Sequence, residues 1–180
     1  MNSEHYPLKN GDDLHIRQAE PEDAASVINY IEAISGESDF LSMGPGEFEV
    51  SVEEEVNILR RFRDAENQLF ILGLVGDQIV ASLSFSSRNR PRLQHTGSFG
   101  MSVRKDYWGF GIGGLMLDTL LSWARETGII TKINLHVRPD NDRALQLYLS
   151  RGFAVEGRLS RTMCINGAYH DSLMMGLKID

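Results

Sequence analysis

Cysteine is almost absent from this chain. Cys164 is the only one among 180 residues, which excludes an internal disulfide and a zinc site built from several thiolates. Long apolar runs are absent too, since none approaches the roughly 20 residues that a membrane-spanning helix needs. The first residues, Met-Asn-Ser-Glu-His-Tyr-Pro, lack the basic and apolar regions of a signal peptide. These absences predict a cytoplasmic protein with no membrane partner and no metal ion.

Basic side chains are outnumbered by acidic ones. The chain has 18 lysines and arginines against 25 aspartates and glutamates, which gives a formal net charge of −7. Proteins that bind nucleic acid by neutralising phosphates are normally basic, so no nucleic-acid partner is expected. The acidic balance mildly favours a cationic partner, although solubility alone also explains it.

The length and the periodicity of the chain predict one α/β domain over residues 1–180, and leave open whether it forms a homodimer. Ala24, Val27, Ile28 and Ile31 fall on one helical face that ends at Gly36. The expected strands cover residues 14–19, 68–75, 78–86, 96–103, 129–137, 153–164 and 168–179, and the expected helices follow Pro21, Ser51, Gly114 and Asn141. The approximate order is βααβββαβαββ in a mixed sheet, and the strand at residues 129–137 has the composition of one buried on both faces.

Short polar motifs mark the ends of several elements. Ser51 with Glu54 three residues later is a capping-box pattern. Asp140 or Asn141 can cap a helix, and Gly152 is placed for a left-handed C-terminal cap. Asn166-Gly167 between two apolar runs predicts a hairpin.

A glycine-rich turn, residues 103–114, lies between a strand-like run and an amphipathic helix. A helix start leaves backbone N–H groups without partners and carries a partial positive charge, so it favours a bound anion. Gly109, Gly111, Gly113 and Gly114 lack a Cβ, which lets a ligand approach the main chain. The turn therefore predicts a phosphate-bearing cofactor.

The same glycines allow a nicotinamide-dependent oxidoreductase as an alternative. Gly109, Gly111 and Gly114 satisfy G-x-G-x-x-G. That fingerprint, however, normally follows the first strand of its domain and needs an acidic residue at the end of the next strand, whereas here the next strand ends His136-Val137-Arg138. A Walker loop is excluded because no lysine follows Gly113 or Gly114.

The run from Val103 to Leu117 resembles the acetyl-CoA motif of the GNAT acetyltransferase superfamily, which reads arginine or glutamine, two residues, glycine, one residue, then glycine or alanine. Superposed on this chain, the motif runs from Trp108 through Gly111 and Gly113, with Trp108 in the place of the basic or amide side chain. Further similarity to the family lies in Ile16-Arg17, residues 21–24, Leu135-His136-Val137, Asn141, Ala144, Tyr148, Gly152 and Phe153.

The resemblance implies a mixed, mostly antiparallel central sheet with a splayed parallel strand pair and helices on both faces. It also implies transfer of an acetyl group from acetyl-CoA to a primary amine, by direct attack in a ternary complex. A non-catalytic acyl-CoA-binding module is the remaining alternative. The residues that the resemblance places against the cofactor are Met101, Ser102, Val103, Arg104, Gly109, Phe110, Gly111, Ile112, Gly113, Gly114, Asn141 and Tyr148.

The resemblance makes Tyr148 the expected donor to the leaving thiolate, because a phenol with a reference pKa of about 10 keeps its proton at neutral pH; a core tyrosine is the other interpretation. The expected strand at residues 96–103 contains no carboxylate to act as base. His136 is the preferred base among candidates that also include Glu37, Glu47, His170 and Asp171, and a water chain is an alternative.

The segment from Ser35 to Val50 would form part of the acceptor site, as the equivalent segment does in the superfamily. It is acidic, and Glu37 and Glu47 are expected to bind the acceptor. Carboxylates suit a cationic amine such as a polyamine, an aminoglycoside, a lysine or a peptide N-terminus. The acceptor itself is left open, because fold and cofactor do not determine it.

Overall fold

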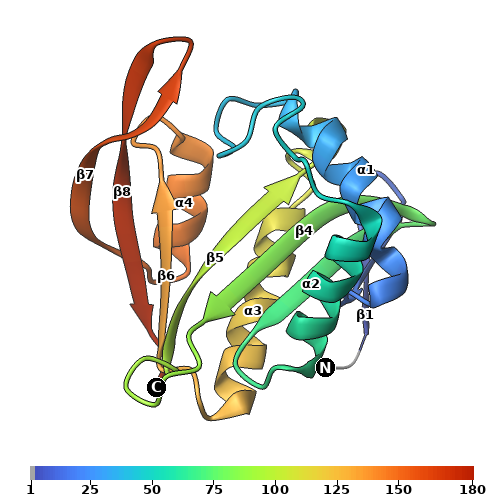
Figure 1. Cartoon of the computed structure of the whole chain (residues 1–180), viewed down its shortest axis with the longest axis horizontal. Helices are drawn as coiled ribbons and strands as arrows, with labels where there is room; N and C mark the ends of the chain where they lie inside the picture. The colour runs from blue at the N-terminus through green and yellow to red at the C-terminus, as the bar shows by residue number, and fades with distance from the viewer. Residues whose placement is uncertain (1–2) are drawn as a thin grey trace.

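One eight-stranded sheet organises the protein, in the order β1-β2-β3-β4-β5-β6-β8-β7, with helices on both faces (Figure 1). The computed structural model describes residues 3–180. The strands are β1 (Glu4–Pro7), β2 (Asp13–Gln18), β3 (Leu69–Val75), β4 (Gln78–Ser87), β5 (Thr96–Val103), β6 (Lys132–Val137), β7 (Ala154–Ile165) and β8 (Ala168–Lys178). The helices are α1 (Ala24–Ser35), α2 (Val52–Asp64), α3 (Ile112–Thr127) and α4 (Asp142–Ser150), with short 3-10 helices at Pro21–Asp23 and Lys105–Tyr107.

The sheet confirms the predicted fold class and nearly all of the predicted element order. One strand was not predicted: β1 is four residues long, ends in a proline and pairs only with β2 at the edge of the sheet, so it has no alternating apolar pattern. The expectation that residues 129–137 form a strand buried on both faces is wrong. In β6, the buried residues Ile133 and Leu135 alternate with half-exposed Asn134 and exposed His136.

The predicted capping motifs are present. The Ser51 hydroxyl accepts a hydrogen bond from the Glu54 amide while the Glu54 carboxylate accepts one from the Ser51 amide. Asn141 caps α4 through the Ala144 amide. Gly152 has a φ of 88°, the left-handed conformation that was expected after the helix.

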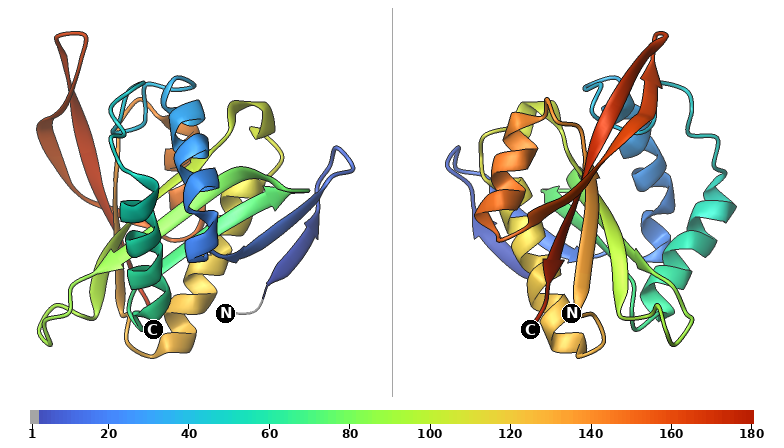
Figure 2. Two further views of the ribbon diagram at one scale, coloured as in Figure 1. Left: turned by 45° about the vertical axis from the view of Figure 1, so that its right-hand side comes forward. Right: turned by 90° about the vertical axis from the view of Figure 1, so that its left-hand side faces the viewer.

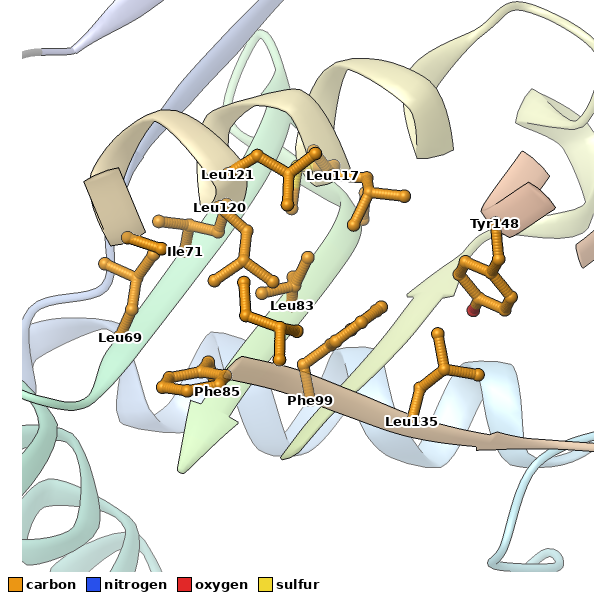
Figure 3. Close-up of a cluster of buried hydrophobic side chains, with 14 of the residues drawn as sticks. Leu69, Ile71, Leu83, Phe85, Phe99, Leu117, Leu120, Leu121, Leu135 and Tyr148 are labelled. Atoms are coloured by element: carbon orange, nitrogen blue, oxygen red, sulfur yellow. The ribbon is translucent and has the colours of Figure 1, made fainter. Parts of the chain in front are cut away.

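Two hydrophobic layers cover the sheet. Helices α3 and α4 pack on one face and helices α1 and α2 on the other (Figure 2). Figure 3 shows the first layer, where Phe85 and Leu120 are fully buried; each such side chain contributes about 1.5–3 kcal/mol by leaving water. In the second layer, α1 buries Ala24 and Val27 of the predicted face together with Tyr30 and Ile34, whereas the predicted Ile28 and Ile31 are only half-buried. None of the helices within residues 3–180 is long and apolar enough to cross a membrane.

The sheet splits between β5 and β6. These parallel strands pair only from Thr96 to Ser98 against Lys132 to Asn134, and then diverge (Figure 1). Strand β6 continues instead along β8, from Lys132 opposite Lys178 to Val137 opposite Leu173. Beyond Ser98 the edge of β5 that faces β6 is therefore left without a partner strand.

Candidate functional site

A cavity of about 700 Å³ occupies the region where the two strands diverge. It is lined by β5 from Phe99 to Val103, by β6 and its following turn from His136 to Arg138, by one side of α4, and by the loop after α1. The site therefore combines both faces of the sheet with the segment that was predicted to bind the acceptor.

The unpaired edge of β5 presents main-chain groups to this cavity. The amide of Arg104 donates to the Val80 carbonyl at 2.9 Å, which directs that residue's N–H toward β4. Since alternate residues of a strand direct their main-chain groups to opposite sides, Met101 and Val103 direct theirs toward the gap. Ser102, by contrast, turns its main chain toward β4 and contributes a hydroxyl.

The glycine-rich turn follows that strand and holds unused hydrogen-bond donors. Gly109 and Gly111 have φ values of 89° and 85° and open space where a Cβ would lie. Within residues 3–180, the amides from Gly109 to Gly113 donate no hydrogen bond. With the positive end of α3 behind them, these amides form an anion-binding position.

Two of the predicted cofactor glycines belong to the first turn of a helix and not to the loop before it. Gly113 and Gly114 lie inside α3, which begins at Ile112. A Cβ on Gly113 would lie 3.4 Å from Leu147, and one on Gly114 would lie 2.7 Å from the Arg151 guanidinium. Both positions lie on the side of α3 that faces Leu147 of α4 and the Arg151 side chain that follows it.

Tyr148 enters the cavity from α4 and is 8% exposed. Its ring packs edge-on against Phe99 at 5.8 Å and lies 5.9 Å from Phe153, between centroids (Figure 3). Burial raises the pKa of Tyr148 to about 12, so the phenol keeps its proton. Among the described residues no hydrogen-bond partner is found for its hydroxyl, which leaves that group available to a bound molecule.

His136 borders the same cavity from β6. Its neighbours Leu135 and Val137 are buried in the layer under α3 and α4, so the alternation of the strand directs His136 to the opposite face. Tyr148 and His136 therefore approach the cavity from different faces of the sheet.

Glu37 and Glu47, the two predicted acceptor residues, are placed differently. Glu37 lines the cavity, and its carboxylate accepts a hydrogen bond from the Lys105 amide at 2.6 Å and lies 3.6 Å from the Arg104 guanidinium. Glu47 is exposed, does not line the cavity, and accepts from the Gly44 amide at 2.8 Å. Arg104, predicted to contact the cofactor, is thus already paired with a carboxylate.

A buried arginine at the site was not predicted from the sequence. Arg138 follows β6, is 8% exposed, and pairs with Asp140 through two hydrogen bonds. It also donates to the Asp39 carbonyl at 3.1 Å and stacks 4.9 Å from the centre of the Phe40 ring. It thereby fastens the loop after α1 to the end of β6, a contact across 99 residues that no local pattern reveals.

A chain of hydroxyl groups on the α1 side of the site was also not predicted. Tyr30 of α1 lies 3.0 Å from the Ser102 hydroxyl, which lies 3.2 Å from that of Ser82. Burial raises the pKa of Tyr30 to about 12, against the opposing effect of its hydrogen bonds with the two serines. These contacts hold α1 against β5 beside the cavity.

Trp108 occupies the position where the motif has a basic or amide side chain. Its indole N–H donates to the Val103 carbonyl at 2.7 Å. The Arg143 guanidinium, from the first turn of α4, lies over the indole at 4.5 Å from the ring centre. Both residues line the cavity.

Comparison with known proteins agrees with this fold. The family model described as "Acetyltransferase (GNAT) family" matches residues 37–153. A solved acetyltransferase of the GNAT family from Streptococcus pneumoniae superposes with a TM-score of 0.90 at 32% identity, covering 92% of this chain and 99% of that one.

Curated relatives match over shorter stretches. The L-amino acid N-acetyltransferase AaaT of Escherichia coli is 25% identical over 105 residues, which are 58% of this chain and 65% of that protein. The spermidine N(1)-acetyltransferase of Vibrio cholerae is 28% identical over 115 residues, 64% of this chain and 61% of that protein. The chain thus spans less than two thirds of the length of either relative.

Proposed function

The chain belongs to the GNAT acetyltransferase family, and from this premise we propose that it acetylates a primary amine at the cavity between β5 and β6. Acetyl-CoA is the acetyl donor of this family, and membership excludes the nicotinamide alternative. The observation that carries the proposal is the meeting of three features at one cavity: the unpaired edge of β5, the donor-rich glycine turn and the buried phenol of Tyr148.

The donor would lie along β5 and end at the glycine turn. Main-chain groups of Met101 and Val103 would pair with the pantetheine amides, as an added strand does. The amides from Gly109 to Gly113 would hold the pyrophosphate at the positive end of α3. The Asn141 side-chain oxygen caps α4, which leaves the side-chain NH2 group to donate a hydrogen bond to acetyl-CoA.

In the proposed reaction the acceptor nitrogen attacks the thioester carbon, and the C–S bond breaks as the tetrahedral intermediate collapses. Tyr148 would donate a hydrogen bond or a proton to the leaving sulfur, since its pKa of about 12 keeps the phenol protonated. The attacking amine loses one proton, to His136 directly or to water, and the products are an N-acetyl amide and CoA thiol.

Acetyl-CoA turnover over a panel of amines tests the activity. The panel holds a polyamine, an aminoglycoside, free amino acids and peptides with an N-terminal amine, and release of CoA thiol is measured. At 100 times its dissociation constant, acetyl-CoA should stabilise the fold by about 2.7 kcal/mol. Stabilisation without turnover on any amine would indicate an acyl-CoA-binding module instead.

Replacing Tyr148 with phenylalanine tests the proposed donor to sulfur. The ring packing against Phe99 stays, while the hydroxyl is lost. Y148F should lower kcat on the order of 10²-fold or more, with little change in acetyl-CoA affinity. Full activity in Y148F would assign Tyr148 to packing alone.

For the acceptor we propose a cationic amine, with support from acidic groups at the cavity. Glu37, Asp140 and Asp142 border it. Two of these carboxylates already have cationic partners, Arg104 and Arg138, whereas Asp142 has no ion pair within residues 3–180. A polyamine should therefore show the highest kcat/KM among the amines of this panel. A preference for an acceptor with a free carboxylate would contradict this assignment.

A further inference from the structure

Trp108 and Arg143 form a cation–π pair at the cavity where the CoA donor would bind. The motif's basic or amide side chain is missing at position 108, and the indole that replaces it cannot bind a phosphate with charge. The structure nonetheless places a guanidinium at that point, because Arg143 lies 4.5 Å from the centre of the Trp108 ring. At this position the positive charge comes from α4 instead of from residue 108.

Arg143 is exposed and forms no ion pair within residues 3–180. The other arginines around the site are each paired with a carboxylate: Arg104 with Glu37, Arg138 with Asp140, and Arg151 with Asp118. Arg143 thus retains its N–H donors for a ligand. A guanidinium stacked on an aromatic face keeps its planar fork directed outward, where it can bind a phosphate with two parallel hydrogen bonds.

The position of Arg143 in its helix is also informative. It is the second residue of α4, after the Asn141 cap, and a cation in the first turn of a helix is repelled by the helix dipole. An anion bound beside it removes that repulsion. Gly109, whose amide has no partner among the described residues, borders the same cavity next to Trp108.

We propose that Arg143, positioned by the indole of Trp108, binds a phosphate of the CoA donor and replaces the charge that position 108 lacks. The inference rests on the proposed function, since it assumes that the donor occupies the cavity. Trp108 acts as a positioning residue: its N–H fixes the ring on the Val103 carbonyl, and the ring fixes the guanidinium.

Binding of three ligands to the intact protein tests this assignment. Dissociation constants are measured by calorimetry for CoA, for 3′-dephospho-CoA and for pantetheine, which has no phosphate. R143A should weaken CoA binding about 10-fold or more, as expected for loss of a charge-assisted contact, and leave pantetheine binding unchanged. The matched control is R90A, an exposed arginine on the β4–β5 loop at the other end of β5, and it should change neither constant.

The ligand series identifies the phosphate. An equal loss with 3′-dephospho-CoA assigns Arg143 to the pyrophosphate, and a loss confined to CoA assigns it to the 3′-phosphate. The dependence of CoA binding on salt should also be shallower in R143A, because one ionic contact is gone. CoA and pantetheine weakened alike, or CoA bound within twofold of wild type, would overturn the proposal.

Variants of Trp108 test its positioning role. W108F keeps an aromatic face and W108L removes it, so CoA binding should weaken more in W108L. The effect of R143A should be smaller in the W108L background than in wild type, because the two residues act as a unit. Equal losses in W108F and W108L, or additive effects, would contradict the role of the indole. Failure of the wild-type protein to bind CoA would instead reject the proposed function.

Discussion

The carboxylate of Glu37 accepts a hydrogen bond from the backbone N–H of Lys105 at 2.6 Å. This contact joins the loop after α1 to the turn after β5, two segments that are 68 residues apart. The nearby Arg104 guanidinium adds an ion pair at 3.6 Å. The proposed acceptor side and the proposed donor side of the cavity are thus connected through one half-buried side chain.

Replacing Glu37 should therefore weaken binding of the acceptor amine more than a substitution elsewhere in the same loop. E37A leaves the Lys105 amide without its acceptor and removes the partner of Arg104, so the loop loses its fixed position. We expect a rise of about 10-fold in the KM for the amine and a loss of roughly 1–2 kcal/mol in the free energy of unfolding. Steady-state kinetics and urea denaturation measure the two effects.

Glu47 provides the matched control for that substitution. It belongs to the same acidic loop, but it is exposed and its carboxylate accepts a hydrogen bond from the nearby Gly44 amide. E47A should leave the KM for the amine unchanged. If E47A and E37A raised that KM equally, the loop would act through its net charge and not through the contact with Lys105.

The glycine turn gives a second prediction. Gly111 has a φ of 85° with open space around its Cβ position, so G111A strains the backbone by roughly 1 kcal/mol and distorts the amides that would face the pyrophosphate. Acetyl-CoA affinity should fall several-fold in a folded protein. G114A is the control inside α3: its Cβ would lie 2.7 Å from the end of the flexible Arg151 side chain, which can move, so acetyl-CoA affinity should change little. A larger loss of acetyl-CoA affinity in G114A than in G111A would place the anion site deeper in α3.

The glycines of this turn also show what the sequence could and could not predict. The residues from Val103 to Gly114 were sufficient to identify the turn and its helix, because turns and caps depend on neighbouring residues, whereas the family was identified only together with the motifs between Leu135 and Phe153. The roles of Gly113 and Gly114 depend on the packing of α4, which lies about 30 residues later in the chain. Local spacing predicts cofactor contacts for all four glycines but does not reveal these neighbours.

Contacts between distant segments account for the rest of what was missed. Arg138 was noted only as a residue that could not bind a ribose, yet it fastens Asp39 and Phe40 to the end of β6. Its role depends on the path of the loop after α1, which has no periodicity. The proposed acceptor side is therefore the part of the site that the sequence predicted least well.

The two buried tyrosines of the site predict how stability depends on alkaline pH. Tyr30 and Tyr148 each have a pKa raised by burial to about 12, against an ordinary value of 10.0. Below pH 10 both residues are protonated in the folded and the unfolded chain, so their contribution is fully present. Between pH 10 and 12 the unfolded chain releases these protons first, and the free energy of unfolding should fall by about 1–3 kcal/mol for each tyrosine.

Chemical denaturation at pH 8, 10 and 11 measures this effect. In Y148F the fall should be about half as large as in wild type, because one of the two groups is gone. Because the pKa of Tyr148 is raised to about 12, kcat of the wild-type protein should show no decrease caused by Tyr148 between pH 7 and 10. An alkaline fall in kcat that disappears in Y148F would show that the phenol ionises far below its expected pKa.

Asn141 allows a structural role and a ligand role to be separated. Its side-chain oxygen accepts from the Ala144 amide at 3.2 Å and caps α4, and the residue also lines the cavity. N141A removes both the cap and the amide group, so it should cost about 1 kcal/mol of stability and weaken acetyl-CoA binding. N141D keeps an oxygen that can cap the helix but loses the N–H donors and adds a negative charge facing the donor. We therefore expect N141D to match the melting temperature of wild type while acetyl-CoA binds at least as weakly as in N141A. If N141D restored both properties, Asn141 would act on the donor only by holding the first turn of α4, and with it Arg143, in place.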